Sequence, residues 1–553
     1  MRGRQVFMES LVAHGVDRIF GNPGTTESPL LDSLAAYPSI RYVTALQESI
    51  AMCAASFYAQ ASGKTGIVSL HVAPGLGNAI GMLYCAMRAN SPVIVTAGQQ
   101  DTRLRLADPV LGHDLVAMAA PLTKWSVQVE RADEMAPILR RAFKVAHDGP
   151  LGPVFIGLPI DVMEQETANG PVTAGVLDRK PEAPQAALDR IAGLIGQARA
   201  PVIVCGDDVA RSGATQALVK LAETMGASVW VEGLRMHAAF PSAHPSARLL
   251  LPLDSAAIRK VLGDADLVLM AGGPFFEDVW YAPGSPFPSG AKVVQIEESN
   301  ARLGYNYRLD AGAVGDLEAA FTGLVAALEN APVEFGKAAV QRNAQLKELK
   351  AREIAAQKSR AEKAWTREPT SMPRAMSEIR DALPKGTIVV DETITASIDL
   401  AKTIDFAAPG DYFSGRGGGI GQGLAGAIGV AVAQPKRPVV CISGDGSAMY
   451  SIQSLWTAAH MALPIVFVIL VNREYRVLKH NIDVYRQKFG ITSQEPYAQM
   501  DLTGPDLGFV ELAAGMGVAG SRVTKADGIR AAIEAAFKTG RPHLVEVAIE
   551  AKR

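Results

Sequence analysis

Short apolar runs alternate with longer amphipathic stretches along the whole chain. Ten runs are predicted to be strands, at residues 66–70, 91–98, 152–159, 201–206, 266–272, 292–297, 386–392, 438–446, 464–472 and 543–549. Because the runs are apolar almost throughout, both faces of each strand are expected to be buried. Apolar strands separated by helices are typical of parallel sheets covered on both faces. We therefore expect an α/β fold of doubly wound, mainly parallel sheets.

Two changes in composition divide the chain. Residues 163–188 are rich in Pro, Gly, Thr and Ala, and residues 333–373 carry mixed charges. In the second segment Glu348 and Arg352 are four residues apart, which favours an exposed linker helix. The sequence thus predicts three α/β domains, at about 1–165, 185–335 and 373–553. A length of 553 residues fits that number.

The composition limits which classes of binding partner and which cellular compartment are expected. Lys and Arg total 54 and Asp and Glu total 56, and the net charge of −2 gives no electrostatic case for a nucleic-acid partner. The four cysteines are scattered without a CxxC pair, which argues against a thiolate zinc site and is typical of a reducing cytoplasm. The chain shows no signal-peptide core and no apolar run of about 20 residues. We expect a cytoplasmic protein without membrane contact.

The sharpest motif lies in the third predicted domain, where two successive strands end in polar residues. One strand leads into Asp445, and the next ends at Asn472, 27 positions later. Because the carboxyl ends of parallel strands meet at one edge of a sheet, the two side chains are expected to lie close together. With the main-chain carbonyl of Glu474 they form a hard-oxygen ligand set typical of Mg²⁺ or Ca²⁺. The motif predicts a metal site with positions left for phosphate oxygens.

The glycines around Asp445 point to a phosphate beside that metal. Gly444 and Gly446 allow a close backbone approach, and the amides of Gly446 and Ser447, at the start of a helix, are expected to face the anion. A Gly-Asp-Gly sequence also occurs as an ordinary strand-to-helix corner. The strand context and the spacing to the second polar residue favour the binding site.

This motif resembles the thiamine-diphosphate motif of the superfamily that includes pyruvate decarboxylase and acetolactate synthase. Benzoylformate decarboxylases within it share further stretches, namely FGNPGTTESPLL (20–31), ALQES (45–49), LHVAPGLGNA (70–79), SPVIVTAGQQ (91–100), GGGIGQGLAGAIGV (417–430) and GDGSAMYSIQSLWTAA (444–459). The resemblance covers nearly the whole chain. It implies pyrimidine-binding, central and diphosphate-binding domains in that order, with thiamine diphosphate and Mg²⁺ as cofactors and Ca²⁺ or Mn²⁺ as alternative metals.

The resemblance identifies Glu48, in RYVTALQES, as the family's proton-relay carboxylate. Its carboxyl would share a proton with N1′ of the cofactor aminopyrimidine and so promote loss of the thiazolium C2 proton. Without the resemblance, Glu48 would be interpreted as an acidic residue at a helix N-terminus, stabilised by the helix dipole. In the family this residue belongs to the partner subunit. The resemblance therefore implies a homodimer at least, and a homotetramer, with active sites at the dimer interface.

Further cofactor contacts carry over from the family. Ile420, in GGGIGQG, matches the bulky aliphatic residue that holds the cofactor bent, and Gly418 matches the carbonyl that accepts from its 4′-amino group. Thr393 and Thr395 lie in a loop that would meet the diphosphate. The main-chain amide of Tyr475 is expected to reach a phosphate as well.

The resemblance also implies residues that contact the substrate. His71 matches an active-site histidine of benzoylformate decarboxylases, although a lone histidine after an apolar run is more often a core residue. Thr25 falls where those enzymes carry a serine that binds the substrate carboxylate. The loop before it, Asn22, Pro23 and Gly24, is expected to line the same pocket.

One position departs from the family pattern. Benzoylformate decarboxylases have a second active-site histidine in the central domain, and an alignment of residues 272–284 puts Val279 there, beside Trp280. Valine cannot transfer a proton, so protonation would fall to His71, water or another group. Val477 is expected to line the substrate pocket from the third domain.

The sequence is compatible with three candidate functions. The first is a non-oxidative 2-oxo acid decarboxylase that yields an aldehyde and CO₂, against which the missing histidine counts. The second is a carboligase or lyase, acetolactate-synthase-like or a 2-hydroxyacyl lyase, acting on an aldehyde or acyl acceptor. FAD, which many such synthases bind, is not supported, because residues 201–213 lack GxGxxG. The third is a cofactor-binding protein without catalysis, against which the presence of Glu48, Asp445 and Asn472 argues.

Overall fold

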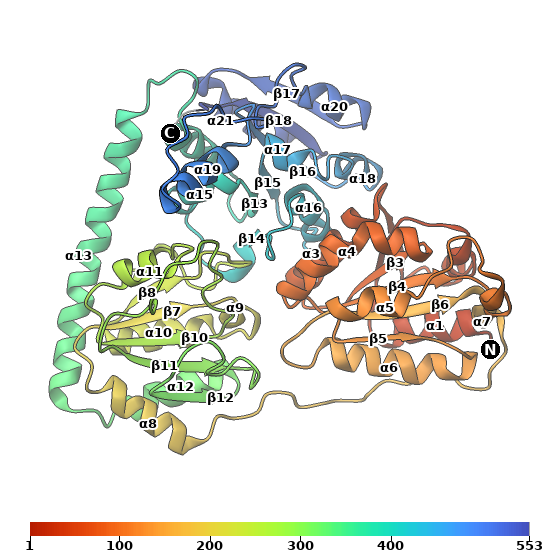
Figure 1. The fold of residues 1–553 in the computed structure, drawn as a ribbon, viewed down its shortest axis with the longest axis horizontal. Coiled ribbons are helices and arrows are strands. Elements are labelled where there is room, and N and C mark those ends of the chain that lie inside the picture. The colour runs from red at the N-terminus through yellow and green to blue at the C-terminus, as the bar shows by residue number, and fades with distance from the viewer. Residues whose placement is uncertain (552–553) are drawn as a thin grey trace.

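The computed structural model describes residues 1–551 and contains three six-stranded sheets in which every strand pair is parallel. Figure 1 shows one sheet in each of three lobes, with the N-terminal lobe in red and orange, the central lobe in yellow and green, and the C-terminal lobe in blue. The predicted α/β class with doubly wound parallel sheets is confirmed. Each sheet lies within one of the three predicted ranges.

The N-terminal sheet has the order β2-β1-β3-β4-β6-β5. Its strands are β1 (Arg18–Gly21), β2 (Arg41–Thr44), β3 (Gly66–Leu70), β4 (Val93–Gln99), β5 (Trp125–Gln128) and β6 (Val154–Pro159). Its helices are α1 (Gly3–Ala13), α2 (Ser28–Ser33), α3 (Glu48–Ser62), α4 (Val72–Arg88), α5 (Leu115–Ala119), α6 (Met135–Ala146) and α7 (Ile160–Glu164). Buried side chains of α3, α4 and α5 form a core on one face of the sheet, and those of α1 and α6 form a core on the other.

The central sheet has the order β12-β11-β10-β7-β8-β9. Its strands are β7 (Pro201–Cys205), β8 (Ser228–Val231), β9 (Ala247–Leu250), β10 (Leu267–Ala271), β11 (Lys292–Glu297) and β12 (Ala311–Val314). Its helices are α8 (Gln185–Ile195), α9 (Asp208–Arg211), α10 (Thr215–Met225), α11 (Ser255–Leu262) and α12 (Leu317–Leu328).

The C-terminal sheet has the order β14-β13-β15-β16-β18-β17. Its strands are β13 (Ile388–Glu392), β14 (Tyr412–Ser414), β15 (Val439–Gly444), β16 (Ile465–Val471), β17 (Ala519–Val523) and β18 (His543–Ala548). Its helices are α14 (Met372–Ala382), α15 (Ser397–Thr403), α16 (Gln422–Ala433), α17 (Asp445–Ala448), α18 (Ser454–His460), α19 (Arg476–Lys488), α20 (Phe509–Gly515) and α21 (Ile529–Lys538). Because β15 and β16 are adjacent and parallel, the motif residues after them share one sheet edge.

Two different segments link the lobes. An extended segment without helix or strand connects α7 to α8, and α13 (Val333–Lys363) connects the central lobe to the C-terminal one. This 31-residue helix runs along the outer edge of the molecule in Figure 1, and only Phe335 and Ala339 are buried in it. The segment predicted to be an exposed linker helix is therefore helical and largely exposed.

The N-terminal and C-terminal lobes join through α3 and α16. Residues of both helices belong to one buried core that also includes strands of both sheets. The helices approach so closely that a Cβ atom at Gly429 would lie 2.1 Å from the carbonyl oxygen of Ala54, and one at Gly426 would lie 2.6 Å from the ring of Phe57. Glycine is required at both positions because the facing backbone and ring occupy the space.

The helices give no sign of a membrane span. Across residues 1–551, none combines the length and the apolarity that crossing a bilayer demands.

Candidate active site

At the carboxyl edge of the N-terminal sheet, Glu48 is held by two amide side chains. It is the first residue of α3, whose N-cap Gln47 accepts hydrogen bonds from the next turn, and it is only 8% exposed. Asn22 Nδ2 donates to one carboxyl oxygen at 3.2 Å, and Asn78 Nδ2 donates to the other at 3.0 Å. These donors fix the orientation of a buried carboxyl group at the start of a helix.

Close to Glu48, a buried acid holds His71. The histidine follows β3 as the N-cap of α4, and its Nδ1 lies 2.9 Å from Oε2 of Glu27 and 3.2 Å from the Thr26 hydroxyl. Glu27 is buried and also accepts from the backbone amides of Gly24 and Gly98, both at 3.0 Å. With Nδ1 directed at this carboxylate, Nε2 is the nitrogen left to face a substrate.

The predicted substrate loop lies against these two groups. A Cβ atom at Gly24 would lie 2.2 Å from the His71 ring, so only glycine lets the loop pass there. Thr25 is exposed at the start of a short 3₁₀ turn, and the neighbouring threonine, not Thr25, contacts the histidine. Asn22 bonds to Glu48, and Pro23 is exposed beside it. The structure thus gathers the predicted N-terminal residues at one sheet edge.

A second group of predicted residues surrounds Asp445 at the carboxyl edge of the C-terminal sheet. The carboxylate of Asp445 accepts from the backbone amides of Gly446 at 2.8 Å, Asn472 at 3.0 Å and Arg473 at 2.6 Å. Burial raises the pKa of Asp445, and these amides oppose that rise. Within residues 1–551 no cationic side chain is bonded to this buried carboxylate. Such a carboxylate suits a bound metal ion, which would stabilise the charged form.

The turn after β16 completes this donor set. The Asn472 side-chain oxygen accepts from the amide of Glu474 at 3.1 Å, and the Glu474 carboxylate pairs with Lys479. Among the described residues no three His, Cys, Asp or Glu side chains cluster as a metal site. A metal here would therefore depend on one carboxylate, one amide oxygen and main-chain carbonyls, which are ligands that Mg²⁺ accepts.

The glycines of the motif leave room for an anion. Nothing lies within 4 Å of a Cβ atom built at Gly444, whereas one at Gly446 would lie 2.5 Å from the Tyr475 ring. Ser447 is buried in the short helix α17. The Tyr475 amide donates to the carbonyl of Met500 at 2.8 Å, and the Tyr475 ring packs on Gly446. A contact between this amide and a phosphate stays a prediction.

A third buried acid, Glu392, organises the turn that carries Gly418 and Ile420. Glu392 ends β13, is 5% exposed, and accepts from the backbone amides of residues 421, 422 and 423 at 2.7, 2.8 and 2.8 Å. Burial raises the pKa of Glu392 to about 7, although these bonds oppose the rise. Gly418 has φ +75°, a left-handed conformation that favours glycine. The acid fixes the turn against the end of the strand.

Several predicted residues line one cleft of about 1400 Å³ between the central and C-terminal lobes. They are Gly418, Ile420, Thr395, Val477, Val279 and Trp280. Thr393 lies outside this lining, since its hydroxyl donates to Asp391 at 2.7 Å. Val279 is 56% exposed and offers no polar atom to the cleft.

Within one chain, the Glu48 group and the Ile420 turn lie apart. A Cβ atom at Gly75 would lie 3.7 Å from the Glu48 side chain, and one at Gly419 would lie 2.5 Å from the sulfur of Cys85. Gly75 and Cys85 are ten residues apart in α4, which corresponds to about 15 Å of helix. The chain therefore presents two half-sites separated by about that distance.

Comparison with known proteins gives a consistent result. The chain matches the models of the thiamine pyrophosphate enzyme N-terminal TPP binding domain over residues 1–118, central domain over 188–324 and C-terminal TPP binding domain over 395–547. It is 31% identical to benzoylformate decarboxylase of Pseudomonas aeruginosa, over 98% of this chain and 97% of that protein. It is 28% identical to the acetolactate synthase isozyme 2 large subunit of Escherichia coli, over 100% and 96%.

A comparison with solved structures is consistent with these sequence matches. The thiamine diphosphate-dependent 4-hydroxybenzoylformate decarboxylase of Rhodococcus jostii matches with a TM-score of 0.86 and 27% identity, over 100% of this chain and 99% of that one.

Proposed function

The chain belongs to the thiamine pyrophosphate enzyme family, within the superfamily of decarboxylases and acetolactate synthases, and on this basis we propose that it is a Mg²⁺-dependent, non-oxidative decarboxylase of a 2-oxo acid. The observation that carries the proposal is the His71–Glu27 pair beside Glu48. Release of an aldehyde requires a proton to reach the carbon that has lost CO₂, and a histidine fixed by a buried carboxylate is suited to deliver one.

The C-terminal half-site would hold the cofactor's diphosphate and metal. Asp445, Asn472 and the carbonyl of Glu474 are proposed as metal ligands, with the amides of Gly446 and Ser447 facing phosphate oxygens. Gly444 and the Thr393 and Thr395 loop would lie beside them. When bound, thiamine diphosphate supplies the nucleophilic carbon and the electron sink for decarboxylation.

The remaining contacts would orient the two rings and the substrate. Gly418 would accept a hydrogen bond at the turn fixed by Glu392, and Ile420 would pack beside it. Glu48, oriented by Asn22 and Asn78, would hold a proton on the ring nitrogen that it faces. Thr25, Pro23 and Gly24 would contact the substrate together with Val477, Val279 and Trp280.

We further propose that each site combines half-sites of two subunits. The separation of about 15 Å along α4 supports this arrangement, because Glu48 of a chain is too far from its own Gly419 turn to meet the same cofactor ring. The protein would then be a homodimer at least, with a homotetramer as the larger assembly.

The second candidate is a carboligase or lyase of the same superfamily that acts on an aldehyde or acyl acceptor. The observation that favours it is Val279, an exposed aliphatic side chain in the cleft where a second proton-transfer group is expected. A site with fewer proton donors favours capture of an acceptor over protonation.

One experiment separates the two. CO₂ release is measured across a panel of 2-oxo acids with thiamine diphosphate and Mg²⁺, with and without an added aldehyde. Release without acceptor supports the decarboxylase, turnover only with aldehyde supports the carboligase, and absence of both rejects the two.

The substitution Glu48→Gln tests the assigned proton relay. It keeps the size of the side chain and removes the shared proton, so kcat is expected to fall by at least about 100-fold. Glu348→Gln, at an exposed position of α13, is the matched control. Near-normal turnover by Glu48→Gln would show that the carboxyl group has no part in the reaction.

A further inference from the structure

The cleft that contains the Ile420 turn continues outward between two helices. Arg476 lines the cleft at the start of α19. After it the lining residues are Val477, His480, Asn481, Val484 and Lys488, which recur at helical spacing and so share one face of the helix. Eleven residues separate the first from the last, or about 16 Å of helix. The face leads from the turn after the proposed metal site to the end of the helix.

Another wall is formed by residues before and along α15, namely Ile394, Thr395, Ser397, Ile398, Asp399 and Lys402. On each of the two walls aliphatic side chains lie beside polar ones, and the last lining residue is a lysine. The central lobe adds Leu251, Leu253 and Trp280, so the inner part of the cleft is apolar on three sides.

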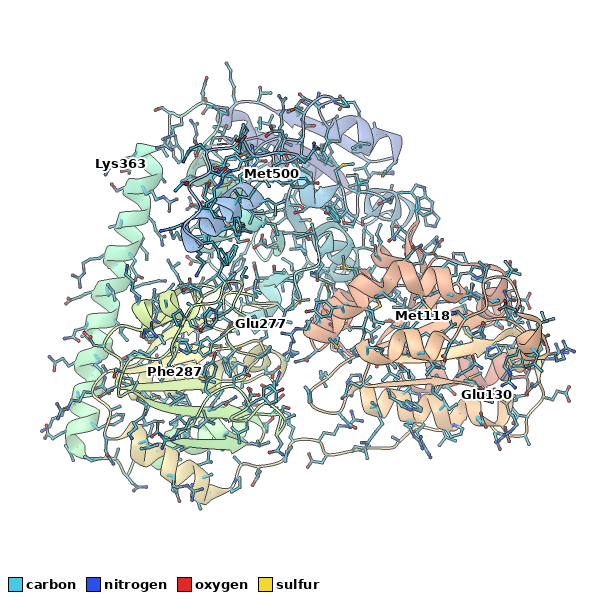
Figure 2. The ribbon with its side chains drawn as sticks, in the orientation of Figure 1. Met118, Glu130, Glu277, Phe287, Lys363 and Met500 are labelled. Atoms are coloured by element: carbon cyan, nitrogen blue, oxygen red, sulfur yellow. The ribbon has the colours of Figure 1, made fainter. Side chains whose placement is uncertain are left out.

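The lining of the cleft is rich in cations. The segments around α13, α15 and α19 contribute six Lys and Arg side chains to it, namely Arg360, Lys363, Arg367, Lys402, Arg476 and Lys488, but only two carboxylates, Asp399 and Glu550. Arg367 pairs with Glu550 at 3.7 Å, and Arg476, at the start of α19, donates to the Glu550 carbonyl at 3.3 Å. Arg360 pairs with Asp399 at 3.1 Å, and Lys488 donates to the carbonyl of Tyr281 at 3.1 Å. Figure 2 labels Lys363 at the end of α13, on the outer side of this region.

Lys402 is a partly buried cation of this lining. Burial, reinforced by the positive charge of Arg360, lowers the pKa of Lys402, and the negative charge of Asp399 opposes this change. Within residues 1–551 no hydrogen bond or ion pair is formed by its ammonium group or by that of Lys363. A partly desolvated ammonium group is costly unless an anion approaches it.

We propose that the substrate is a 2-oxo acid whose apolar side chain ends in a second anionic group, and that Lys402 and Lys488 bind this group at the outer end of the cleft. The inference rests on the proposed function and specifies its substrate class. A small neutral substrate would fill only the apolar part of the cleft and leave the Lys402 ammonium group without a hydrogen bond. A terminal carboxylate or phosphate supplies the same complementary charge.

The kinetic test compares matched substrates. Straight-chain 2-oxo acids of equal length, ending in methyl, carboxylate or phosphonate, are assayed with the holoenzyme. We expect kcat/KM to be at least about tenfold higher for an anionic terminus, and Lys402→Met to lower that ratio about tenfold. Lys347→Met, on the exposed face of α13, is the control and should keep the ratio. The carboxylate and phosphonate arms identify which anion is preferred.

A binding test works even if no 2-oxo acid is decarboxylated. Saturated dicarboxylates and monocarboxylates of the same length are titrated into the holoenzyme by calorimetry. Tighter binding of the dicarboxylate, by about tenfold and dependent on Lys402 and Lys488, supports the anion subsite apart from the reaction. Equal affinities, or a dicarboxylate preference that survives both lysine-to-methionine changes, would reject the subsite. Absence of turnover with all substrates would instead reject the proposed function.

Discussion

At the scale of single residues, Glu392 shows how one buried acid can fix a functional turn. Its carboxylate satisfies three successive backbone amides at the start of α16, where the helix leaves such donors unpaired. The helix dipole favours negative charge there, but burial opposes it and raises the pKa of Glu392 to about 7. The charge state of this turn therefore changes near neutral pH.

The raised pKa predicts a pH dependence of stability. Because the folded chain holds this proton more tightly than the unfolded chain, the associated stability is complete below about pH 4.5 and is lost as pH rises through 7. For this group alone the loss between pH 6 and 8 is about 1 kcal/mol. Thermal unfolding of Glu392→Gln should show a smaller decrease in midpoint over that range than wild type. Parallel pH profiles for the two proteins would contradict the assignment.

The residues that the sequence predicted are those whose role depends on strand ends and spacing. Asp445 and Asn472 lie together because adjacent parallel strands end at the same edge. Glu27 and Glu392 escaped prediction, because an acid beside a turn usually faces solvent and only tertiary packing buries these two. The hydrogen bond from the Tyr475 amide to the Met500 carbonyl was not predicted, because the two residues are 25 positions apart and no sequence pattern links them.

At the scale of elements, apolar runs predicted ten of the twelve inner strands, but not the inner strands β1 and β8 or the edge strands. All ten apolar runs contain strands that have neighbours on both sides, such as β10 and β16, whose residues are buried throughout. Edge strands such as β9 and β17 are four or five residues long and partly exposed, so they lack a continuous apolar run. The signal for a strand in this fold is burial on both faces.

The close contact between α3 and α16 predicts how a substitution there changes the stability of the protein. Gly429→Ala places a Cβ atom 2.1 Å from the Ala54 carbonyl, which the rigid backbone of α3 cannot accommodate without separating the helices. Although alanine favours helix, we expect destabilisation of about 1–3 kcal/mol, measured by denaturant unfolding. Gly193→Ala in α8, where no atom lies within 4 Å, is the control and should stabilise by up to about 1 kcal/mol. A stabilised Gly429→Ala would show that the helices pack less closely.

At the scale of the whole molecule, buried charges tie the three lobes together. Arg416 of the C-terminal lobe is fully buried and pairs with two acids of the central lobe, Asp207 at 2.6 Å and Glu277 at 2.7 Å. Glu277 also pairs with Arg88 of α4, and Figure 2 places it between the lobes. Burial of these charges is tolerated because each one has a partner of opposite charge. The network therefore favours one arrangement of the three lobes.

The proposed shared site predicts complementation between inactive subunits. Glu48→Gln and Asp445→Asn should each be inactive, but a mixed dimer would contain one site with both native residues. Random mixing by co-expression should therefore restore about a quarter of wild-type activity. The two variants purified separately and mixed without exchange are the control. If co-expressed subunits stay inactive although they form mixed dimers, each site belongs to a single chain.

The long exposed helix α13 has a consequence for how the chain tolerates changes in length. Its first turns pack on the central lobe, while Arg360, near its end, pairs with Asp399 of α15. Inserting one residue in between would rotate everything beyond it by about 100° and swing that arginine off its partner. Inserting four would nearly restore the rotation but add about 6 Å of length. Although α13 is exposed along most of its length, its contacts with the two lobes therefore fix how many residues it contains.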